Sequence, residues 1–266
     1  METGYSKWRK LDNAAIAFPL VTGRNDSRVF RFYCQLKEEV DPDILQSALD
    51  QTMEKYPLFQ AVLRKGLFWF YLERREIKAL VKPERKPPCS QLYIPDQKSL
   101  LFRVSYHKNR INFEVYHALT DGTGAMNFIT ELVQDYLILA HPEVELPRIE
   151  MADEATPGEK EEDSFSQYYS SKIPKNKEKK QSAVKLKGEK LLHADMQITE
   201  VVVPVKETLA KARSYGVSIT VLLTAMLLCS IHEEIPKNRQ KKPVALMIPV
   251  NLRRYMRSGI RHVFLH

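Results

Sequence analysis

The sequence has few of the features that mark secreted proteins. It holds only 3 cysteines in 266 residues, and Cys34, Cys89 and Cys229 are too scattered to suggest a disulfide framework. No apolar segment follows a basic head at the N-terminus, so no signal peptide is predicted. Both observations favour a reducing compartment, and we expect a cytoplasmic protein.

Long hydrophobic runs are also missing. The longest nearly apolar run, residues 219–231, is shorter than a bilayer requires and contains threonine and serine, so we expect no membrane span. There is no zinc-binding pattern and no repeat of aromatic and basic residues, which argues against a nucleic-acid partner. The net charge of +8 fits an anionic ligand, although a well-solvated exterior is the simpler interpretation.

The composition is that of a globular protein, with 44% apolar and 28% charged residues. Its patterns indicate an α/β fold. Alternating or apolar runs predict strands at residues 29–36, 59–63, 67–72, 101–106 and 111–116. Helical spacing predicts helices from the Asp41-Pro42 cap to Tyr56, and from the turn near residue 121 to Ala140.

The chain changes character after residue 150. Acidic residues crowd positions 153–163 and lysines crowd positions 172–190, and such blocks are usually solvated connections. Beyond them we expect a strand at 197–203, a helix at 206–215 closed by Gly216, an all-round apolar central helix at 221–231 and a buried strand at 244–250. The predicted division is a first lobe at 1–150, a charged linker at 151–192 and a second lobe at 193–266.

One stretch stands out as a candidate site. Residues 110–116 alternate between polar and apolar, which puts His117 on the apolar face at the end of a strand. Four residues later, Asp121-Gly122 turns the chain into an amphipathic helix. Loops between a rigid strand and a rigid helix often carry chemistry.

Two other interpretations of this stretch remain open. His117 could be a core histidine that happens to precede an Asp-Gly turn. His117 and Asp121 could also both ligate a metal, but no other His, Cys or Glu lies at a ligand-like spacing nearby, so we expect no metal.

The His-x-x-x-Asp-Gly pattern between a strand and a helix resembles the active-site motif of the chloramphenicol-acetyltransferase-like superfamily. This group includes peptide-synthetase condensation domains and the alcohol acetyltransferases, and the chain looks most similar to a bacterial alcohol acetyltransferase. The resemblance also covers residues 8–12 (Trp-Arg-Lys-Leu-Asp), 49–57 (Leu-Asp-Gln-Thr-Met-Glu-Lys-Tyr-Pro) and 248–253 (Ile-Pro-Val-Asn-Leu-Arg), in the family's order.

The resemblance implies acyl transfer from a thioester, acyl-CoA or carrier-bound, to an alcohol or an amine. His117 would be the catalytic general base, because an imidazole accepts a proton near neutral pH. Asp121, Gly122 and Arg253 would support the site: Asp121 would pair with Arg253, and Gly122 would let the backbone turn tightly. No permanently bound cofactor is implied. The sequence assigns no substrate-binding residues and no oligomeric state.

The second lobe departs from the family pattern. It is short, and it lacks the Asp-Phe-Gly-Trp-Gly-like motif that many members carry. The expected fold is therefore a two-lobed chloramphenicol-acetyltransferase-like sandwich with a complete first lobe and a partial second lobe. The alternative to an acyltransferase is a catalytically inactive, truncated remnant or a binding module of the same fold.

Overall fold

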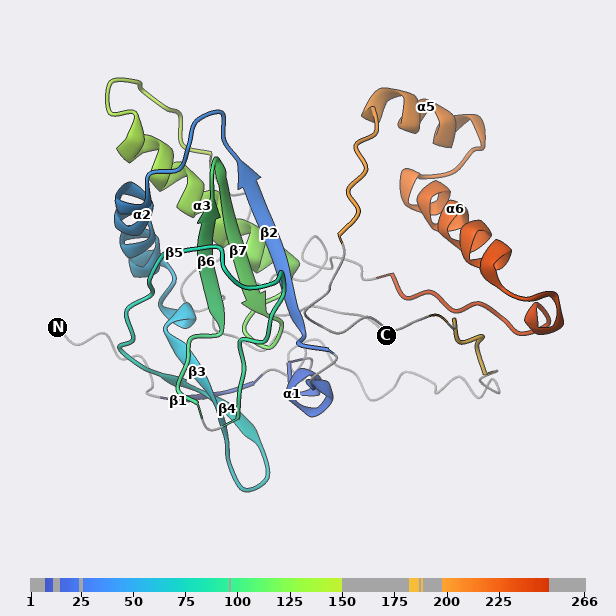
Figure 1. The fold of residues 1–266 in the computed structure, drawn as a ribbon, viewed down its shortest axis with the longest axis horizontal. Coiled ribbons are helices and arrows are strands. Elements are labelled where there is room, and N and C mark those ends of the chain that lie inside the picture. The colour runs from blue at the N-terminus through green and yellow to red at the C-terminus, as the bar shows by residue number, and fades with distance from the viewer. Residues whose placement is uncertain are drawn as a thin grey trace, which may run out of the picture. The chain divides into compact units, whose positions relative to one another are not determined.

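The computed structural model describes residues 8–11, 15–23, 26–95, 97–149, 182–186, 188 and 198–248. These residues fall into two compact units (Figure 1). The larger unit comprises the described residues up to 149, and the smaller comprises those from 182 to 248. The larger unit mixes strands and helices, so the predicted α/β class is confirmed.

The larger unit contains a four-stranded sheet with the order β2-β7-β6-β5. Its strands are β2 (Val29–Gln35), β7 (Arg110–Tyr116), β6 (Phe102–His107) and the two-residue β5 (Lys82–Pro83). All neighbours are antiparallel except β5 and β6. Strands β2, β7 and β6 match the predicted strands closely, because in each of them apolar residues alternate with polar ones and one face is buried.

A second sheet has three strands in the order β1-β4-β3. It pairs β1 (Trp8–Lys10) with β4 (Phe70–Arg74), and β4 with β3 (Ala61–Lys65), all antiparallel. The predicted hairpin is therefore present, although its strands start about two residues later than expected. Residues 57–59 form a short 3₁₀ helix, η1 (Pro57–Phe59), instead of the start of a strand.

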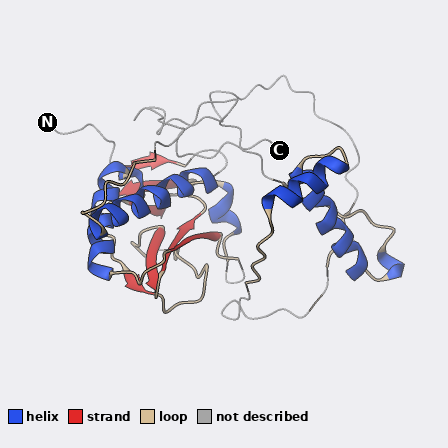
Figure 2. Cartoon of the chain, turned by 90° about the horizontal axis from the view of Figure 1, so that it is seen from above, coloured by secondary structure: helices blue, strands red, loops and turns tan. Residues whose placement is uncertain are grey.

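Helices α2 (Pro42–Lys55) and α3 (Gly122–Ala140) lie side by side on one face of the four-stranded sheet (Figures 1 and 2). Asp41 caps α2 by accepting hydrogen bonds from the backbone N–H groups of Asp43 and Ile44, as its sequence predicted. A short helix, α1 (Ala17–Val21), precedes β2.

Stacked aromatic rings form the centre of this unit. Phe128 of α3 lies parallel to Phe59 of η1 and to Phe113 of β7, with ring centroids 4.4 and 4.7 Å apart. Phe102 of β6 and Tyr56 contact the same ring. One core therefore joins helix, 3₁₀ turn and sheet, and it fixes the strand and helix on either side of His117.

A buried carboxylate ties the two helices together. The side chain of Asp135 on α3 is fully buried and accepts hydrogen bonds from Thr52 and Lys55 of α2, at 3.1 and 3.0 Å. Arg148 also donates to Asp135, at 3.2 Å, and bridges it to Glu131. These bonds set the angle between α2 and α3, and so the direction in which α3 leaves the His117 loop.

The smaller unit consists of α5 (Val205–Ser214), α6 (Ile219–Glu234) and the 3₁₀ turn η3 (Lys237–Arg239). Gly216 ends α5 with φ of 67°, as predicted, because the left-handed region suits glycine. Ser218 caps α6 by accepting a hydrogen bond from the N–H of Val221.

Three expectations for the smaller unit are wrong. Residues 198–203 and 244–248 run without a strand, because none of the strands in the described residues pairs with them. Helix α6 buries none of its side chains in the part of the chain that the structure describes, although its all-round apolar sequence predicted a central position. Arg253 and nearly all of the predicted linker at 151–192 lie outside the described residues.

No described helix has by itself both the length and the apolar composition of a membrane span; only α5 and α6 taken together would, across an 84° bend.

Candidate active site

His117 lies directly after β7, the most deeply buried strand of the four-stranded sheet. Six consecutive residues of β7, from Ile111 to Tyr116, are buried, and His117 is half-buried. Its backbone N–H donates a 2.8 Å hydrogen bond to the carbonyl of Arg28, just before β2. The predicted order of strand, turn and helix is thus present, and this hydrogen bond ties the backbone of His117 to the start of β2.

Two aromatic rings hold the His117 imidazole. Phe18 of α1 stacks on it with ring centroids 4.3 Å apart and an interplanar angle of 11°. Phe30 of β2 lies 4.8 Å away at 53°. Phe30 pairs with Val115 across the sheet, so the imidazole is on the same face as Val115, as the alternation predicted. The ring therefore has a defined plane and keeps part of its surface exposed.

The residue before His117 anchors the end of α1. The buried Tyr116 hydroxyl forms a 2.7 Å hydrogen bond with the Thr22 hydroxyl, and Thr22 donates to the carbonyl of Phe18. Tyr93 stacks on the Tyr116 ring at 5.5 Å. Through these contacts β7 holds both the imidazole and the helix that carries Phe18.

Burial raises the pKa of Tyr116 to about 12, more than the Thr22 hydrogen bond lowers it, and burial also raises the pKa of Tyr56 to about 12. In the unfolded chain both phenols titrate near pH 10. The unfolded chain therefore ionises at a lower pH than the folded one, so we expect the contribution of these two tyrosines to the free energy of unfolding to be constant up to about pH 10 and to fall towards pH 12. Urea unfolding across this range will measure the decrease. Tyr56→Phe/Tyr116→Phe should flatten it, and an unchanged slope would contradict the assignment.

Asp121 caps helix α3. It is 5% exposed, and its carboxylate accepts a 3.0 Å hydrogen bond from the N–H of Gly124. A carboxylate at this position satisfies a free N–H group and complements the positive end of the helix dipole. Its expected partner, Arg253, lies outside the described residues, so the Asp121–Arg253 pair stays a prediction.

Gly122 differs from the expectation that it permits a tight turn. It is the first residue of α3 and does not have a positive φ. Apart from its two neighbours in the chain and the backbone of its own helix, a Cβ built on Gly122 meets no atom of the described residues within 4 Å. The backbone of this chain therefore does not itself require glycine at position 122.

The open space beside Gly122 makes a substitution informative. We expect Gly122→Ala to raise the free energy of unfolding by about 0.4–1 kcal/mol, because alanine restricts the unfolded chain. If substrate passes close to this position, the same variant will raise KM. Denaturant unfolding and steady-state kinetics will separate the two effects. A loss of stability would show that the backbone does need glycine here.

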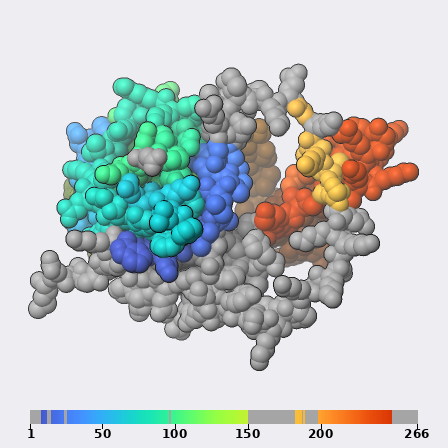
Figure 3. Space-filling view, turned by 90° about the horizontal axis from the view of Figure 1, so that it is seen from below, coloured from blue at the N-terminus to red at the C-terminus, as the bar shows by residue number. Residues whose placement is uncertain are grey.

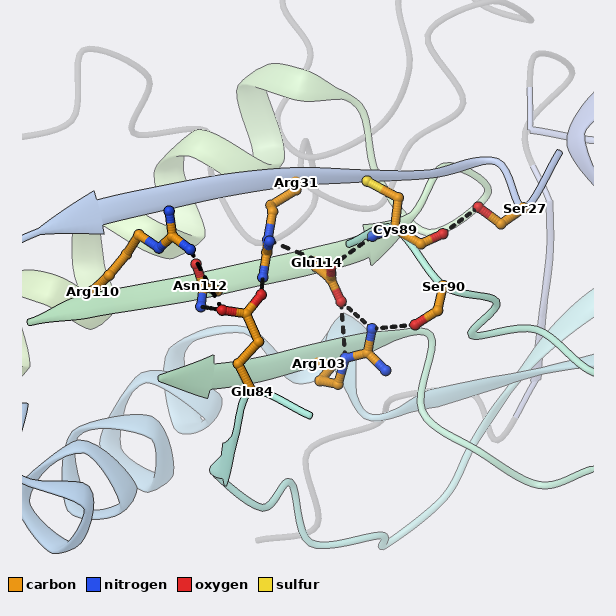
Figure 4. A network of polar contacts seen from close by, with 9 residues as sticks. All are labelled: Ser27, Arg31, Glu84, Cys89, Ser90, Arg103, Arg110, Asn112 and Glu114. Atoms are coloured by element: carbon orange, nitrogen blue, oxygen red, sulfur yellow. Dashed lines mark hydrogen bonds and ion pairs between the residues drawn. The ribbon is translucent and has the colours of Figure 1, made fainter. Parts of the chain in front are cut away.

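The opposite face of the four-stranded sheet carries a network of buried charges (Figure 4). Glu114 of β7 is 1% exposed and lies between Arg103 of β6, which donates to it from Nε at 2.9 Å, and Arg31 of β2, at 3.5 Å. The N–H of Cys89 also donates to Glu114, at 2.7 Å. Arg31 further pairs with Glu84.

The pKa values of two groups in this network follow from these contacts. Burial alone would raise the pKa of Glu84, but the hydrogen bond and charge of Arg31, together with the charge of Arg110, hold it below the usual value. Burial raises the pKa of the Cys89 thiol, and the charge of Glu114 adds to this. Cys89 is therefore a poor nucleophile in this environment.

A cavity of about 420 Å³ opens over this network. The following residues line it: Arg31, Lys82, Pro83, Glu84, Arg85, Lys86, Arg103, Ser105 and Glu114. Arg31 and Arg103, two of the three arginines that line it, already pair with glutamates. The network therefore cross-links β2, β7, β6 and the β5 segment, and its guanidinium groups are not available to hold an anion.

Among the described residues, no three His, Cys, Asp or Glu side chains gather into a group that could hold a metal ion. The Asp121 carboxylate is engaged at the helix cap.

The sequence did not reveal the aromatic contacts of His117. Phe30 was recognisable as an inward residue of the first strand, but nothing in the sequence linked Phe18 or Thr22 to the motif nearly one hundred residues later. Glu114 was also missed, because alternation along the strand predicted a solvent-facing glutamate. The three basic residues Lys82, Arg85 and Lys86, together with Arg103, were the available signal for a charged layer on that face.

Comparisons with known proteins identify fold neighbours only. No protein-family model matches the sequence, and neither does any curated protein. Solved structures that resemble the chain include the starter condensation domain of rhizomide synthetase RzmA, with 12% identity over 54% of this chain and 40% of that one, at a TM-score of 0.44. Another is polyketide synthase associated protein 5 from Mycobacterium tuberculosis, with 18% identity over 57% and 38%, at 0.40.

A chain of the complex of the X-domain and OxyB from teicoplanin biosynthesis is similar to the same degree, with 12% identity over 56% of this chain and 36% of that one, at a TM-score of 0.43. The chain spans about two fifths of the length of these structures. A condensation domain is among them. At these TM-scores the likeness carries no argument about chemistry, which depends on the residues of this chain.

Proposed function

We propose that the chain transfers an acyl group from a thioester, acyl-CoA or carrier-bound, to an alcohol or an amine, with His117 as the general base. The observation that carries the proposal is the His117 imidazole, which is half-exposed at the end of a buried strand and stacked on Phe18. A general base needs a fixed ring, a free approach and a pKa near working pH, and histidine offers the last by its nature.

The reaction then has two proton transfers. A ring nitrogen of His117 takes the proton from the acceptor hydroxyl or amine as its oxygen or nitrogen attacks the thioester carbonyl. When the carbon–sulfur bond breaks, the imidazolium returns that proton to the leaving thiolate. No acyl-enzyme is needed, which fits a sequence without a Gly-x-Ser-x-Gly nucleophile motif.

Asp121 supports the site from a distance in this proposal. By capping α3 it fixes the end of the loop that begins at His117. Its further pairing with Arg253 would join that loop to the second lobe. The three cysteines are free, in keeping with a proposed cytoplasmic location.

The test is thioester cleavage by the purified chain, with acetyl-CoA and longer acyl-CoA donors, in the presence and absence of alcohols and amines. Release of free thiol that depends on the acceptor, together with the ester or amide product, supports the proposal. Release that does not respond to any acceptor would point to hydrolysis and contradict it.

A non-catalytic binding module is the second candidate. The missing strands at 198–203 and 244–248, and the apolar surface of α6, favour it, because an acyl-donor tunnel needs a second wall. A chain that binds acyl-CoA in equilibrium dialysis, and releases no thiol from it with any acceptor, would be a module of this kind.

A further inference from the structure

The turn of the β3–β4 hairpin carries three consecutive apolar side chains into solvent. Leu67 is 91% exposed, Phe68 is 89% exposed and Trp69 is 55% exposed. The hairpin extends beyond the other strands of its unit (Figure 1), and the space-filling view shows its cyan atoms uncovered beside the dark blue atoms of β1 (Figure 3). Trp8 of β1 is also 55% exposed.

Such a turn is unusual because hairpin turns are normally built from Gly, Asn, Asp and Ser. This one is closed by a 2.7 Å hydrogen bond from the N–H of Gly66 to the carbonyl of Trp69, which leaves the side chains at 67 and 68 pointing away from the sheet. They contribute little to the core of this unit. Adjacent exposed Leu, Phe and Trp side chains mark a binding surface more often than a folding requirement.

The charges around the tip have one dominant sign. The segments 8–10 and 61–75, which hold the three-stranded sheet, contain six basic residues and one acidic residue, Glu73. Glu73 is engaged by Arg64 and Arg75. Lys65 is exposed at the end of β3, next to the turn, and Lys10 is exposed on β1, which pairs with β4. The apolar tip (Leu67, Phe68 and Trp69) therefore lies next to two exposed lysines, Lys10 and Lys65, which we call the basic collar.

We infer that this hairpin docks on an anionic lipid surface, with Leu67 and Phe68 inserted among the acyl chains and Lys10 and Lys65 at the headgroups. Leu and Phe partition into the apolar boundary, Trp favours the interface, and lysines near a membrane are attracted by acidic lipids. An apolar groove on a protein would accept the tip as well, but the basic collar selects a surface with dense negative charge. This inference is independent of the acyltransferase proposal.

The chain carries its own reporter for this contact. Its only two tryptophans are Trp8 in β1 and Trp69 in the turn of the β3–β4 hairpin, so its tryptophan emission reports on this surface alone. We expect vesicles of phosphatidylcholine and phosphatidylserine to shift the emission of the full chain to shorter wavelength. Brominated acyl chains should quench it. Vesicles of phosphatidylcholine alone should bind much more weakly.

Substitutions locate the contact. Leu67→Ser/Phe68→Ser should weaken co-sedimentation with the acidic vesicles by roughly a hundredfold, about tenfold for each lost apolar side chain. Lys65→Gln should weaken it about fivefold. The matched control is Leu80→Ser/Val144→Ser, which removes two apolar side chains of the same unit that are 54% and 49% exposed.

Unchanged far-UV circular dichroism will show that each variant is folded. If the wild-type chain does not bind acidic vesicles, the inference is overturned; this is the result expected if the tip instead binds a groove on a protein. Equal binding of the tip variant and the control, or equal binding to neutral and acidic vesicles, would overturn it too.

Discussion

Replacing His117 with phenylalanine is expected to abolish acyl transfer and to leave the fold intact. A phenyl ring can occupy the same position against Phe18 and Phe30, so the stacking that holds this loop is kept. It cannot accept a proton, however, and loss of a positioned base lowers the rate roughly 10²- to 10⁴-fold. Thiol release from acyl-CoA in the presence of an alcohol measures the rate, and thermal unfolding measures the fold.

The same substitution at His107 is the control, because His107 is exposed at the end of β6 and lies on another turn. His107→Phe should change neither quantity. Full activity in His117→Phe would remove the general-base assignment. A large loss of stability in His117→Phe, with His107→Phe unaffected, would favour the interpretation of His117 as a structural histidine.

Neutralising Glu114 is expected to have the largest effect on stability. Glu114→Gln keeps the size of the side chain but leaves Arg103 without its buried partner and Arg31 with Glu84 alone. The side chains of Arg31 and Arg103 are only 10% and 17% exposed, so water cannot replace the lost carboxylate fully. Breaking a buried pair from one side costs about 3–5 kcal/mol, which urea unfolding at neutral pH will show.

A compensating variant tests the explanation. Arg103→Met/Glu114→Met removes both charges of the pair and fills the space with apolar atoms, so it should be more stable than Glu114→Gln. Glu76→Gln, at an exposed position, is the control and should stay within about 0.5 kcal/mol of the wild type. If Glu114→Gln were as stable as this control, the network would not stabilise the fold as a cross-link between the strands.

The larger unit was predictable because its signals are local. The alternation at residues 29–36 and 111–116, and the Asp41-Pro42 cap, agree with the environment that each residue finds. Where the structure differs from the prediction, a specific contact explains the difference. Phe59 was expected to start a strand, but it packs on Phe128 at the end of a 3₁₀ turn. No single-sequence pattern encodes that ring pair.

The site was predictable in part for the same reason. The positions of His117 and Asp121 follow from strand period and turn chemistry, and both lie where those rules put them. The partners of His117 do not, because Phe18 and Thr22 are distant in sequence and reach the motif through the tertiary fold. The role of Gly122 was inferred from residue type, and its backbone conformation gave a different answer.

The smaller unit shows the limit of reading burial from composition. Helix α6 has the apolar surface of a central helix, and residues 244–248 have the sequence of a central strand. A strand exists only with a neighbour, and an apolar helix is buried only where something covers it. The apolar composition of a segment indicates that it needs a packing partner, but it does not indicate whether such a partner is present.

The two elements that hold His117, strand β7 and helix α1, should unfold locally on very different timescales. Strand β7 is buried over six consecutive residues and hydrogen-bonded on both sides, so its amide protons should be among the slowest to exchange with deuterium. Helix α1 has five residues and no buried side chain, so local unfolding of that segment requires much less free energy. Amide exchange in α1 therefore reports how often Phe18 moves off the imidazole and uncovers the ring face on which it stacks, without any opening of the sheet.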